Sequence, residues 1–221
     1  ESIKGRLDGS LPRTGELNPN LVGKALGLNV KEGFAIPDLV APRPPKLCDG
    51  CPHIDSYTAL NEAMKSYGEY KVFADIGCYT LGALPPLKAI YTTVDMGASI
   101  TMAKGAAEAD LRPTVAVIGD STFTHSGMTG LLDCVVDNVP VTVMILDNGI
   151  TGMTGSQKSS ATGRIESICQ GIGVDPAHIR VINPLSSKLE ENTKVIQEEL
   201  EYQGVSVIIP RRECIVWAQK K

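Results

Sequence analysis

The chain has 221 residues, of which 43% are hydrophobic and 21% charged, and its formal net charge is -4 at pH 7. A chain of this size and composition is expected to bury one good core, with room for a small appendage. Because it contains no basic run, we expect no nucleic acid partner. No segment approaches about 18 consecutive apolar residues, so we also expect no membrane span or membrane partner. The N-terminus lacks the apolar core of a signal peptide, and the sequence therefore predicts a cytoplasmic protein.

The first 46 residues differ in composition from the rest of the chain, being rich in Gly, Pro, Leu and Asn with weak hydrophobic periodicity. We predict that residues 1–46 form an irregular N-terminal arm or linker. Because it begins with Glu1 rather than Met, this arm resembles a piece cut from something longer. The proline-rich run at 42–45 stiffens the passage and marks the boundary, so the main domain is predicted at 47–221.

From Asp55 onward, apolar stripes with helical spacing alternate with short apolar runs bounded by turn residues. The expected helices, in chain order, are 56–67, 97–109, one from Thr124 or Ser126 to about 138, 164–171 and 186–202. The expected strands are 71–76, 90–94, 114–118, 139–146, 179–182 and 205–209. This order predicts an α/β fold with a doubly wound, mostly parallel sheet, because right-handed crossovers place helices on both faces.

Two polar motifs follow buried strands of the predicted sheet. Gly119-Asp120-Ser121 comes after one strand, and Asn148 comes after the next, 28 positions beyond Asp120. That spacing leaves room for one helix and one strand, so neighbouring strands can bring the carboxylate and the amide oxygen together where ligands bind. Hard oxygen ligands of this kind suit Mg²⁺ holding a diphosphate. In the simpler alternative, which either motif alone would favour, the first caps a helix and the second forms a turn.

The six cysteines favour thiolate chemistry over a disulfide framework, because the chain has the composition of a cytoplasmic α/β protein. Four lie in predicted loops near strand or helix ends: Cys48, Cys51, Cys78 and Cys214. Together they suit zinc or a 4Fe-4S cluster, and their spacing does not choose between the two. Cys134 and Cys169 fall inside predicted helices and are expected to be small buried hydrophobes.

The pair of polar motifs resembles the metal motif of thiamine diphosphate enzymes, in which Gly-Asp-Gly is followed by Asn about thirty residues later. In that family the Asp side chain, the Asn side chain and a backbone carbonyl two residues later hold the metal. The resemblance therefore implies Asp120, Asn148 and Ile150 as the Mg²⁺ ligands. Ser121 departs from the family pattern by replacing the second glycine, and its hydroxyl is itself able to donate to a phosphate.

Further segments occur in the same order as in the thiamine diphosphate domain of 2-oxoacid:ferredoxin oxidoreductases. They are Cys48-Asp49-Gly50-Cys51-Pro52-His53, Asp75-Ile76-Gly77-Cys78-Tyr79-Thr80, Met96-Gly97-Ala98-Ser99-Ile100 and Thr154-Gly155-Ser156-Gln157. The resemblance runs from about residue 43 to 214, and it is greatest to the large subunit of indolepyruvate ferredoxin oxidoreductases. It implies thiamine diphosphate, Mg²⁺ and a 4Fe-4S cluster on the four loop cysteines as cofactors. It also implies oxidative decarboxylation of indolepyruvate or another aryl pyruvate, with coenzyme A as acyl acceptor and ferredoxin as electron acceptor.

The same resemblance implies the residues that contact the cofactor. Gly119, Asp120, Ser121 and Thr122 are expected around the diphosphate, Gly97, Ala98 and Ser99 beside the rings, Gly77, Cys78, Tyr79 and Thr80 on the thiazolium side, and Thr151, Gly152, Thr154, Gly155 and Gln157 in a closing loop. His53 follows the cysteine pair and is a candidate catalytic residue, although a lone histidine is more often structural.

One part of such an enzyme has no counterpart in this sequence. Thiamine enzymes generally activate the aminopyrimidine ring with a glutamate from a pyrimidine-binding domain, and the first 46 residues do not match one. We therefore expect a second subunit or segment to complete the site, and we expect this chain to be inactive alone. Two alternatives remain open: the thiamine-binding subunit of a non-oxidative 2-oxoacid decarboxylase, and a non-catalytic assembly module with the same fold.

Overall fold

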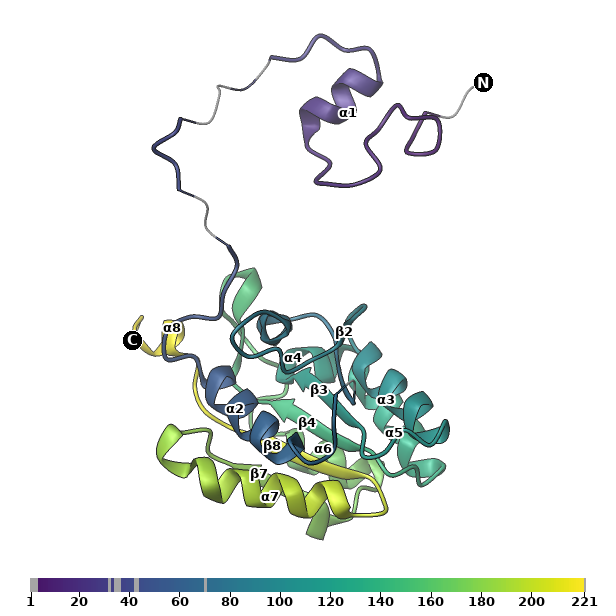
Figure 1. The fold of residues 1–221 in the computed structure, drawn as a ribbon, viewed down its shortest axis with the longest axis vertical. Coiled ribbons are helices and arrows are strands. Elements are labelled where there is room, and N and C mark those ends of the chain that lie inside the picture. Colours follow the sequence, from purple (N-terminus) through teal and green to yellow (C-terminus); the bar gives the residue numbers. More distant parts are fainter. Residues whose placement is uncertain (1–3, 32, 34–36, 42–43, 70, 221) are drawn as a thin grey trace. The chain divides into compact units, whose positions relative to one another are not determined.

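The computed structural model describes residues 4–31, 33, 37–41, 44–69 and 71–220 (Figure 1). The chain divides into two compact units, Glu1–Pro44 and Pro45–Lys221. The division falls near residue 46, where the sequence predicts a boundary, although residues 42 and 43 of the proline-rich run lie outside the described residues.

The first unit contains a short helix, α1 (Pro19–Ala25), within the segment predicted to be an irregular arm. Its N-terminus is capped by Asn18, whose side chain accepts a hydrogen bond from the Leu21 N–H, and Pro19 occupies the first helical position. Both are favourable at a helix start. The prediction missed this helix because it relied on hydrophobic periodicity, which seven residues are too few to display.

A six-stranded parallel sheet forms the centre of the second unit, with the strand order β2-β1-β3-β4-β8-β7. The strands are β1 (Val72–Ala74), β2 (Thr92–Thr93), β3 (Val115–Gly119), β4 (Thr142–Leu146), β7 (Ile179–Ile182) and β8 (Ser206–Pro210). Every residue of β3, β4 and β8 is buried, as expected for parallel strands covered on both faces. The predicted α/β fold with a doubly wound sheet is confirmed.

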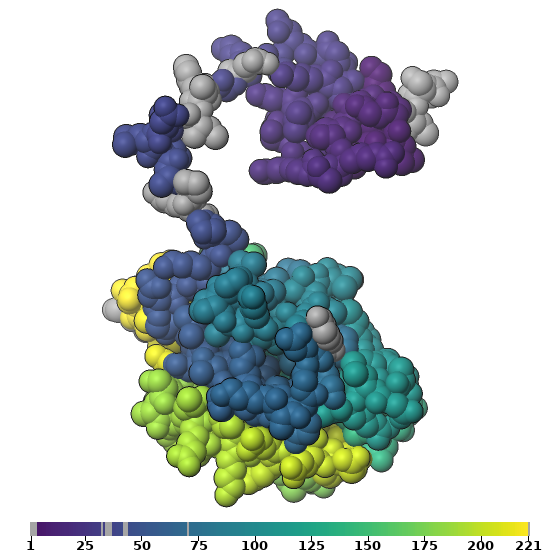
Figure 2. Space-filling view, in the orientation of Figure 1, coloured from purple at the N-terminus to yellow at the C-terminus, as the bar shows by residue number. Residues whose placement is uncertain are grey.

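Helices cover both faces of this sheet. On one face α2 (Pro52–Met64) and α7 (Leu189–Glu201) lie side by side, and Figure 2 shows their surfaces in blue and yellow-green. On the other face lie α3 (Ala98–Glu108), α5 (Met128–Val136) and α6 (Ile165–Ile172), and their buried residues form a separate core with the sheet. Cys134 and Cys169 are fully buried in this second core, as predicted.

The remaining elements are short. They are η1 (Cys78–Ala83), α4 (Asp120–Thr122), η2 (Phe123–Gly127), η3 (Gly152–Thr154), η4 (Pro176–His178), η5 (Ser186–Lys188), α8 (Ile215–Ala218) and an antiparallel pair, β5 (Ile150–Thr151) with β6 (Gln157–Lys158). Within the described residues, no helix combines the length and apolar character needed to cross a membrane.

Several predicted elements have different bounds in the structure. The helix predicted at 56–67 is α2 (Pro52–Met64), and the strand predicted at 139–146 begins at Thr142. The strand predicted at 71–76 ends at Ala74, because the Asp75 side chain turns to hydrogen-bond the start of α3. The strand predicted at 90–94 is reduced to Thr92–Thr93, since it lies at the edge of the sheet and pairs with β1 alone. The helix predicted from Thr124 or Ser126 begins at Asp120, directly after β3, and passes through the π-helical turn η2 into α5.

Candidate functional site

A pocket of about 250 Å³ opens where the carboxyl ends of β1, β3 and β4 meet. It is lined by thirteen of the residues predicted to form the site: His53, Gly77, Cys78, Tyr79, Gly119, Asp120, Ser121, Thr122, Asn148, Ile150, Thr151, Gly152 and Thr154. Ile76, Met96, Leu146 and Met153 add apolar walls that the prediction did not include. This is the edge at which open α/β sheets bind ligands.

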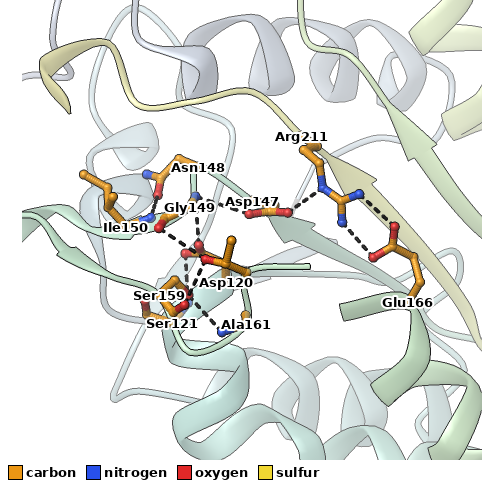
Figure 3. Close-up of polar contacts among 11 residues, drawn as sticks. Asp120, Ser121, Asp147, Asn148, Gly149, Ile150, Ser159, Ala161, Glu166 and Arg211 are labelled. Atoms are coloured by element: carbon orange, nitrogen blue, oxygen red, sulfur yellow. Dashed lines mark hydrogen bonds and ion pairs between the residues drawn. The ribbon is translucent and has the colours of Figure 1, made fainter. Parts of the chain in front are cut away.

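Asp120 is the first residue after β3 and is 3% exposed. Its Oδ1 accepts a hydrogen bond from the Ser121 N–H at 2.8 Å, and its Oδ2 accepts one from the Gly149 N–H at 3.0 Å (Figure 3). Burial raises the pKa of this carboxyl to about 6, and the nearby Asp147 charge adds to the effect. A bound cation would favour the charged form and offset the unfavourable burial of that charge.

Asn148 follows β4 and is held at both ends of its amide group. Its Oδ1 accepts a hydrogen bond from the Ile150 N–H at 3.1 Å, and its Nδ2 lies 3.3 Å from His53 Nε2. Burial lowers the pKa of His53 to about 4, so the ring is neutral at pH 7 and one of its nitrogens can accept a hydrogen bond. With Nε2 as that acceptor, Nδ2 donates to His53 and the Asn148 oxygen is turned towards Ile150.

The phenol ring of Tyr79 forms the floor of the site. A Cβ atom added to Gly119 would lie 2.6 Å from the ring carbon Cε1, and one added to Gly77 would also collide with the ring. Glycine is therefore required at both strand ends for Tyr79 to pack against the backbone. The Tyr79 hydroxyl donates to Asp75, which is fully buried.

Asp75 joins the floor of the pocket to the start of α3, and sequence reasoning assigned it no role. Its Oδ2 accepts hydrogen bonds from Ser99 Oγ at 2.7 Å and from the Gly97 N–H at 3.0 Å. Gly97, Ala98 and Ser99 do not line the pocket. Gly97 and Ser99 bond to this carboxylate, which in turn accepts from the Tyr79 hydroxyl. The sequence placed this acidic residue inside the strand predicted at 71–76, and nothing local indicates its contact with α3.

Thr80 is a second predicted contact that lies outside the pocket lining. Its hydroxyl accepts from the Gly77 N–H at 3.0 Å and donates to the Asp75 carbonyl at 2.7 Å, so it shapes the turn after β1. The closing loop is tied to the start of α4 in a similar way, because Ser121 Oγ lies 2.7 Å from Thr151 Oγ1.

The four loop cysteines do not form a metal site in the structure. Cys48 is exposed, and Cys51, Cys78 and Cys214 are half-buried. Among the described residues, no group of three or more His, Cys, Asp or Glu side chains is arranged to hold a metal ion. The thiols nevertheless lie within electrostatic range of one another: burial raises the pKa of Cys51 to about 11, and the other three add to the shift. Among the described residues these thiols are not gathered as ligands of one metal ion, and the 4Fe-4S cluster on them stays a prediction.

The donor set at the pocket does fit a metal-bound diphosphate. A buried carboxylate and an oriented amide oxygen are hard ligands, and the hydroxyls of Ser121 and Thr151 face the same pocket. The sequence from residue 75 to 209 matches the family described as thiamine pyrophosphate enzyme, C-terminal TPP binding domain. The chain belongs to this thiamine pyrophosphate enzyme family. The expected family, and with it thiamine diphosphate as the cofactor, is confirmed.

Curated relatives of the chain within this thiamine enzyme family are subunits of indolepyruvate oxidoreductases. The chain is 35% identical to an indolepyruvate oxidoreductase subunit IorA from Archaeoglobus fulgidus, over 99% of this chain and 38% of the relative. It is 36% identical to the subunit of the same name from Thermococcus kodakarensis, over 89% of this chain and 34% of the relative. The chain thus spans little more than a third of the length of the curated relatives it matches.

Two solved structures share the fold of this thiamine enzyme domain. A 2-oxoglutarate:ferredoxin oxidoreductase from Magnetococcus marinus superimposes with a TM-score of 0.63 at 18% identity, covering 79% of this chain and 66% of that one. A thiamine diphosphate-dependent 4-hydroxybenzoylformate decarboxylase from Rhodococcus jostii gives a TM-score of 0.53 at 18% identity, covering 88% of this chain and 39% of that one. At this identity the likeness concerns the fold.

Proposed function

We propose that this chain is the thiamine diphosphate-holding part of a 2-oxoacid:ferredoxin oxidoreductase acting on indolepyruvate or another aryl pyruvate. The main observation in support is a hydrogen bond from the Gly149 N–H to Asp120 Oδ2 at 3.0 Å. It joins the motif that contains Asp120 to the motif that contains Asn148. The names of the curated relatives support the choice of substrate. Because they extend well beyond this chain, the activity belongs to a larger assembly.

In this proposal Asp120, Asn148 and the carbonyl of Ile150 hold Mg²⁺. Asp120 supplies a buried charge that a cation would stabilise, and His53 orients the amide of Asn148. Ser121, which stands where the family has its second glycine, directs its hydroxyl to the diphosphate together with the hydroxyl of Thr151. His53 therefore has a positioning role, since its neutral ring contacts a metal ligand.

Thiamine diphosphate, when bound, would supply the nucleophile and the electron sink that decarboxylation of a 2-oxoacid needs. The residues of this chain bind and orient the cofactor. The apolar side chains of Ile76, Met96 and Leu146 line the pocket. A cofactor bound over them would displace water, which would strengthen the electrostatic interactions within the site.

The partners in this proposal are coenzyme A, ferredoxin and a pyrimidine-binding domain or second subunit. One observation supports the last of these: no glutamate is among the described residues that line the pocket. The glutamate that activates the aminopyrimidine ring would then come from the partner. The curated relatives are themselves named as subunits, which fits an enzyme made of more than one chain.

The 4Fe-4S cluster stays a prediction, and no step above depends on it. A second candidate function is non-oxidative decarboxylation of a 2-oxoacid, and a thiamine diphosphate-dependent decarboxylase is among the solved structures that share the fold. In that case the cysteines have structural roles only.

Binding of thiamine diphosphate and Mg²⁺ to the whole chain, measured by calorimetry, tests the proposed site. We expect Asp120→Asn to raise the dissociation constant about tenfold or more, because it removes the charged metal ligand. Asp137→Asn is the matched control, since Asp137 pairs with Lys104 on the surface between α3 and α5. Failure of the wild-type chain to bind the cofactor, even with its partner subunit present, would identify a non-catalytic assembly module instead.

Anaerobic iron and acid-labile sulfide analysis separates the two candidate reactions. About four of each per chain, lost on Cys214→Ala, would support the oxidoreductase. Thiamine diphosphate binding without iron would favour the decarboxylase.

A further inference from the structure

The residue that precedes the proposed metal ligand Asn148 is hydrogen-bonded to the backbone at and just after the end of β8. The Asp147 N–H donates to the Pro210 carbonyl at 3.0 Å, and the Arg212 N–H donates to the Asp147 carbonyl at 3.1 Å. Asp147 and Arg211 thus form a parallel bridge beyond the ends of β4 and β8. The side chains of these two residues extend this connection.

Arg211 links the carboxylates of Asp147 and Glu166, which precede it by 64 and 45 positions in the sequence (Figure 3). Its Nε donates to Asp147 Oδ2 at 2.6 Å, while Nη1 and Nη2 donate to the two oxygens of Glu166 at 2.7 Å each. Glu166 lies in the first turn of α6. A planar guanidinium bound on two edges in this way is held in one orientation.

The other carboxylate oxygen of Asp147 contacts residues 148–150, which carry two of the proposed metal ligands and are called the metal loop below. Asp147 is 6% exposed, and its Oδ1 accepts a hydrogen bond from the Gly149 N–H at 3.2 Å. The same N–H donates to Asp120 Oδ2 at 3.0 Å. A continuous series of hydrogen bonds therefore runs from Glu166 on α6 through the guanidinium to Asp120, the first residue after β3.

Two buried carboxylates, Asp120 and Asp147, share this one N–H and repel each other. Among the described residues, Arg211 forms an ion pair with Asp147, and no ion pair of Asp120 is seen. Without the guanidinium, the side chain of Asp147 would keep only its hydrogen bond from the Gly149 N–H. The backbone at Gly149 has a φ of +78°, a conformation that favours glycine.

We propose that Arg211, held by Glu166, is a positioning residue for the metal loop: it fixes Asp147, and through Gly149 it sets how Asn148 and Ile150 present their oxygens to the metal. The inference rests on the proposed function, because it assumes that this loop binds a cation. It adds Arg211, Glu166 and Asp147 to the site, although none of them would touch the metal. Groups that orient metal ligands in this way strongly influence metal affinity.

Mn²⁺ binding in the presence of thiamine diphosphate, followed by electron paramagnetic resonance of the whole chain, measures the effect directly. We expect Arg211→Met to raise the Mn²⁺ dissociation constant about 10- to 100-fold. Arg211→Lys should give an intermediate value, because a lysine cannot hold both carboxylates in one plane. Arg212→Met is the matched control: this neighbouring arginine binds Asp55 and the Pro184 carbonyl instead, and we expect an unchanged Mn²⁺ affinity.

Hydrogen exchange of the Gly149 N–H in the metal-free chain provides a readout that does not depend on the cofactor. Arg211→Met should accelerate this exchange, while Arg212→Met should leave it at the wild-type rate. If Arg211→Met fails to fold, Glu166→Gln keeps the shape of the side chain and removes its charge, and it should also accelerate exchange and weaken Mn²⁺ binding.

Wild-type Mn²⁺ affinity and wild-type Gly149 exchange in a folded Arg211→Met variant would overturn the inference. Equal effects of Arg211→Met and Arg212→Met would also overturn it, since they would indicate general loosening of the strand end. If the wild-type chain binds neither Mn²⁺ nor thiamine diphosphate even with its partner subunit present, the proposed function fails, and the exchange rate of Gly149 alone decides whether Arg211 fixes the loop.

Discussion

The carboxylate of Asp75 accepts a hydrogen bond from Ser99 Oγ at 2.7 Å, which ties the end of β1 to the first turn of α3 beneath the cofactor pocket. The Tyr79 hydroxyl and the Gly97 N–H donate to the same carboxylate. Burial raises the pKa of Asp75, and these hydrogen bonds oppose that shift. The floor of the pocket thus depends on one fully buried acidic side chain.

Replacing Asp75 with Ala should lower the free energy of unfolding by about 2–4 kcal/mol, because the four groups of Tyr79, Gly97 and Ser99 that donate to it would lose a buried partner. Urea denaturation measures this change. Asp95→Ala is the control, since Asp95 is exposed and should change stability by less than about 0.5 kcal/mol. Equal effects of the two substitutions would contradict the role given to the Asp75 network.

Gly119→Ala should destabilise the protein by about 1–3 kcal/mol and weaken cofactor binding, because the new Cβ would lie 2.6 Å from the Tyr79 ring. Thermal unfolding and calorimetric titration of thiamine diphosphate measure the two effects. Gly105→Ala is the matched control: this glycine lies within α3 and a Cβ there meets nothing within 4 Å. The control should gain about 0.5–1 kcal/mol from helix propensity.

The ion pair between Glu166 and Arg211 should make stability depend on pH. The Arg211 guanidinium lowers the pKa of Glu166 below its ordinary value of 4.5. A lowered pKa in the folded state stabilises the protein above the unfolded pKa, and this contribution is lost as the pH falls through the folded pKa. Glu166→Gln should therefore be less stable than wild type at neutral pH, by about 1 kcal/mol after solvent screening. The difference should shrink in acid, and a difference independent of pH would contradict this assignment.

The hydroxyls of Ser121 and Thr151 should act as a pair in closing the pocket, since they lie 2.7 Å apart. Ser121→Ala and Thr151→Val should each weaken thiamine diphosphate binding, and the double variant should be weakened by less than the sum of the two effects. The expected coupling energy is about 0.5–1.5 kcal/mol, measured by calorimetry in a double-mutant cycle. Strict additivity would show that the two side chains bind independently.

The main features of the fold could be predicted from the sequence because they depend on local patterns. Short apolar runs identified the buried strands β3, β4 and β8, and helical stripes identified α2, α3, α6 and α7. Element ends were less accurate where side chains make distant contacts. β1 ends early because Asp75 bonds to α3, and no local signal in 71–76 carries that information.

The sequence by itself determined the family, through the resemblance of its motifs. It also identified the proposed metal ligands, because Asp120 and Asn148 follow adjacent buried strands at a spacing that a parallel sheet converts into proximity. Only the tertiary structure decided how those ligands are held. His53 meets Asn148 across 95 positions, and Arg211 meets Asp147 and Glu166 across 64 and 45. Such contacts depend on where separate elements end in space, which hydrophobic periodicity does not specify.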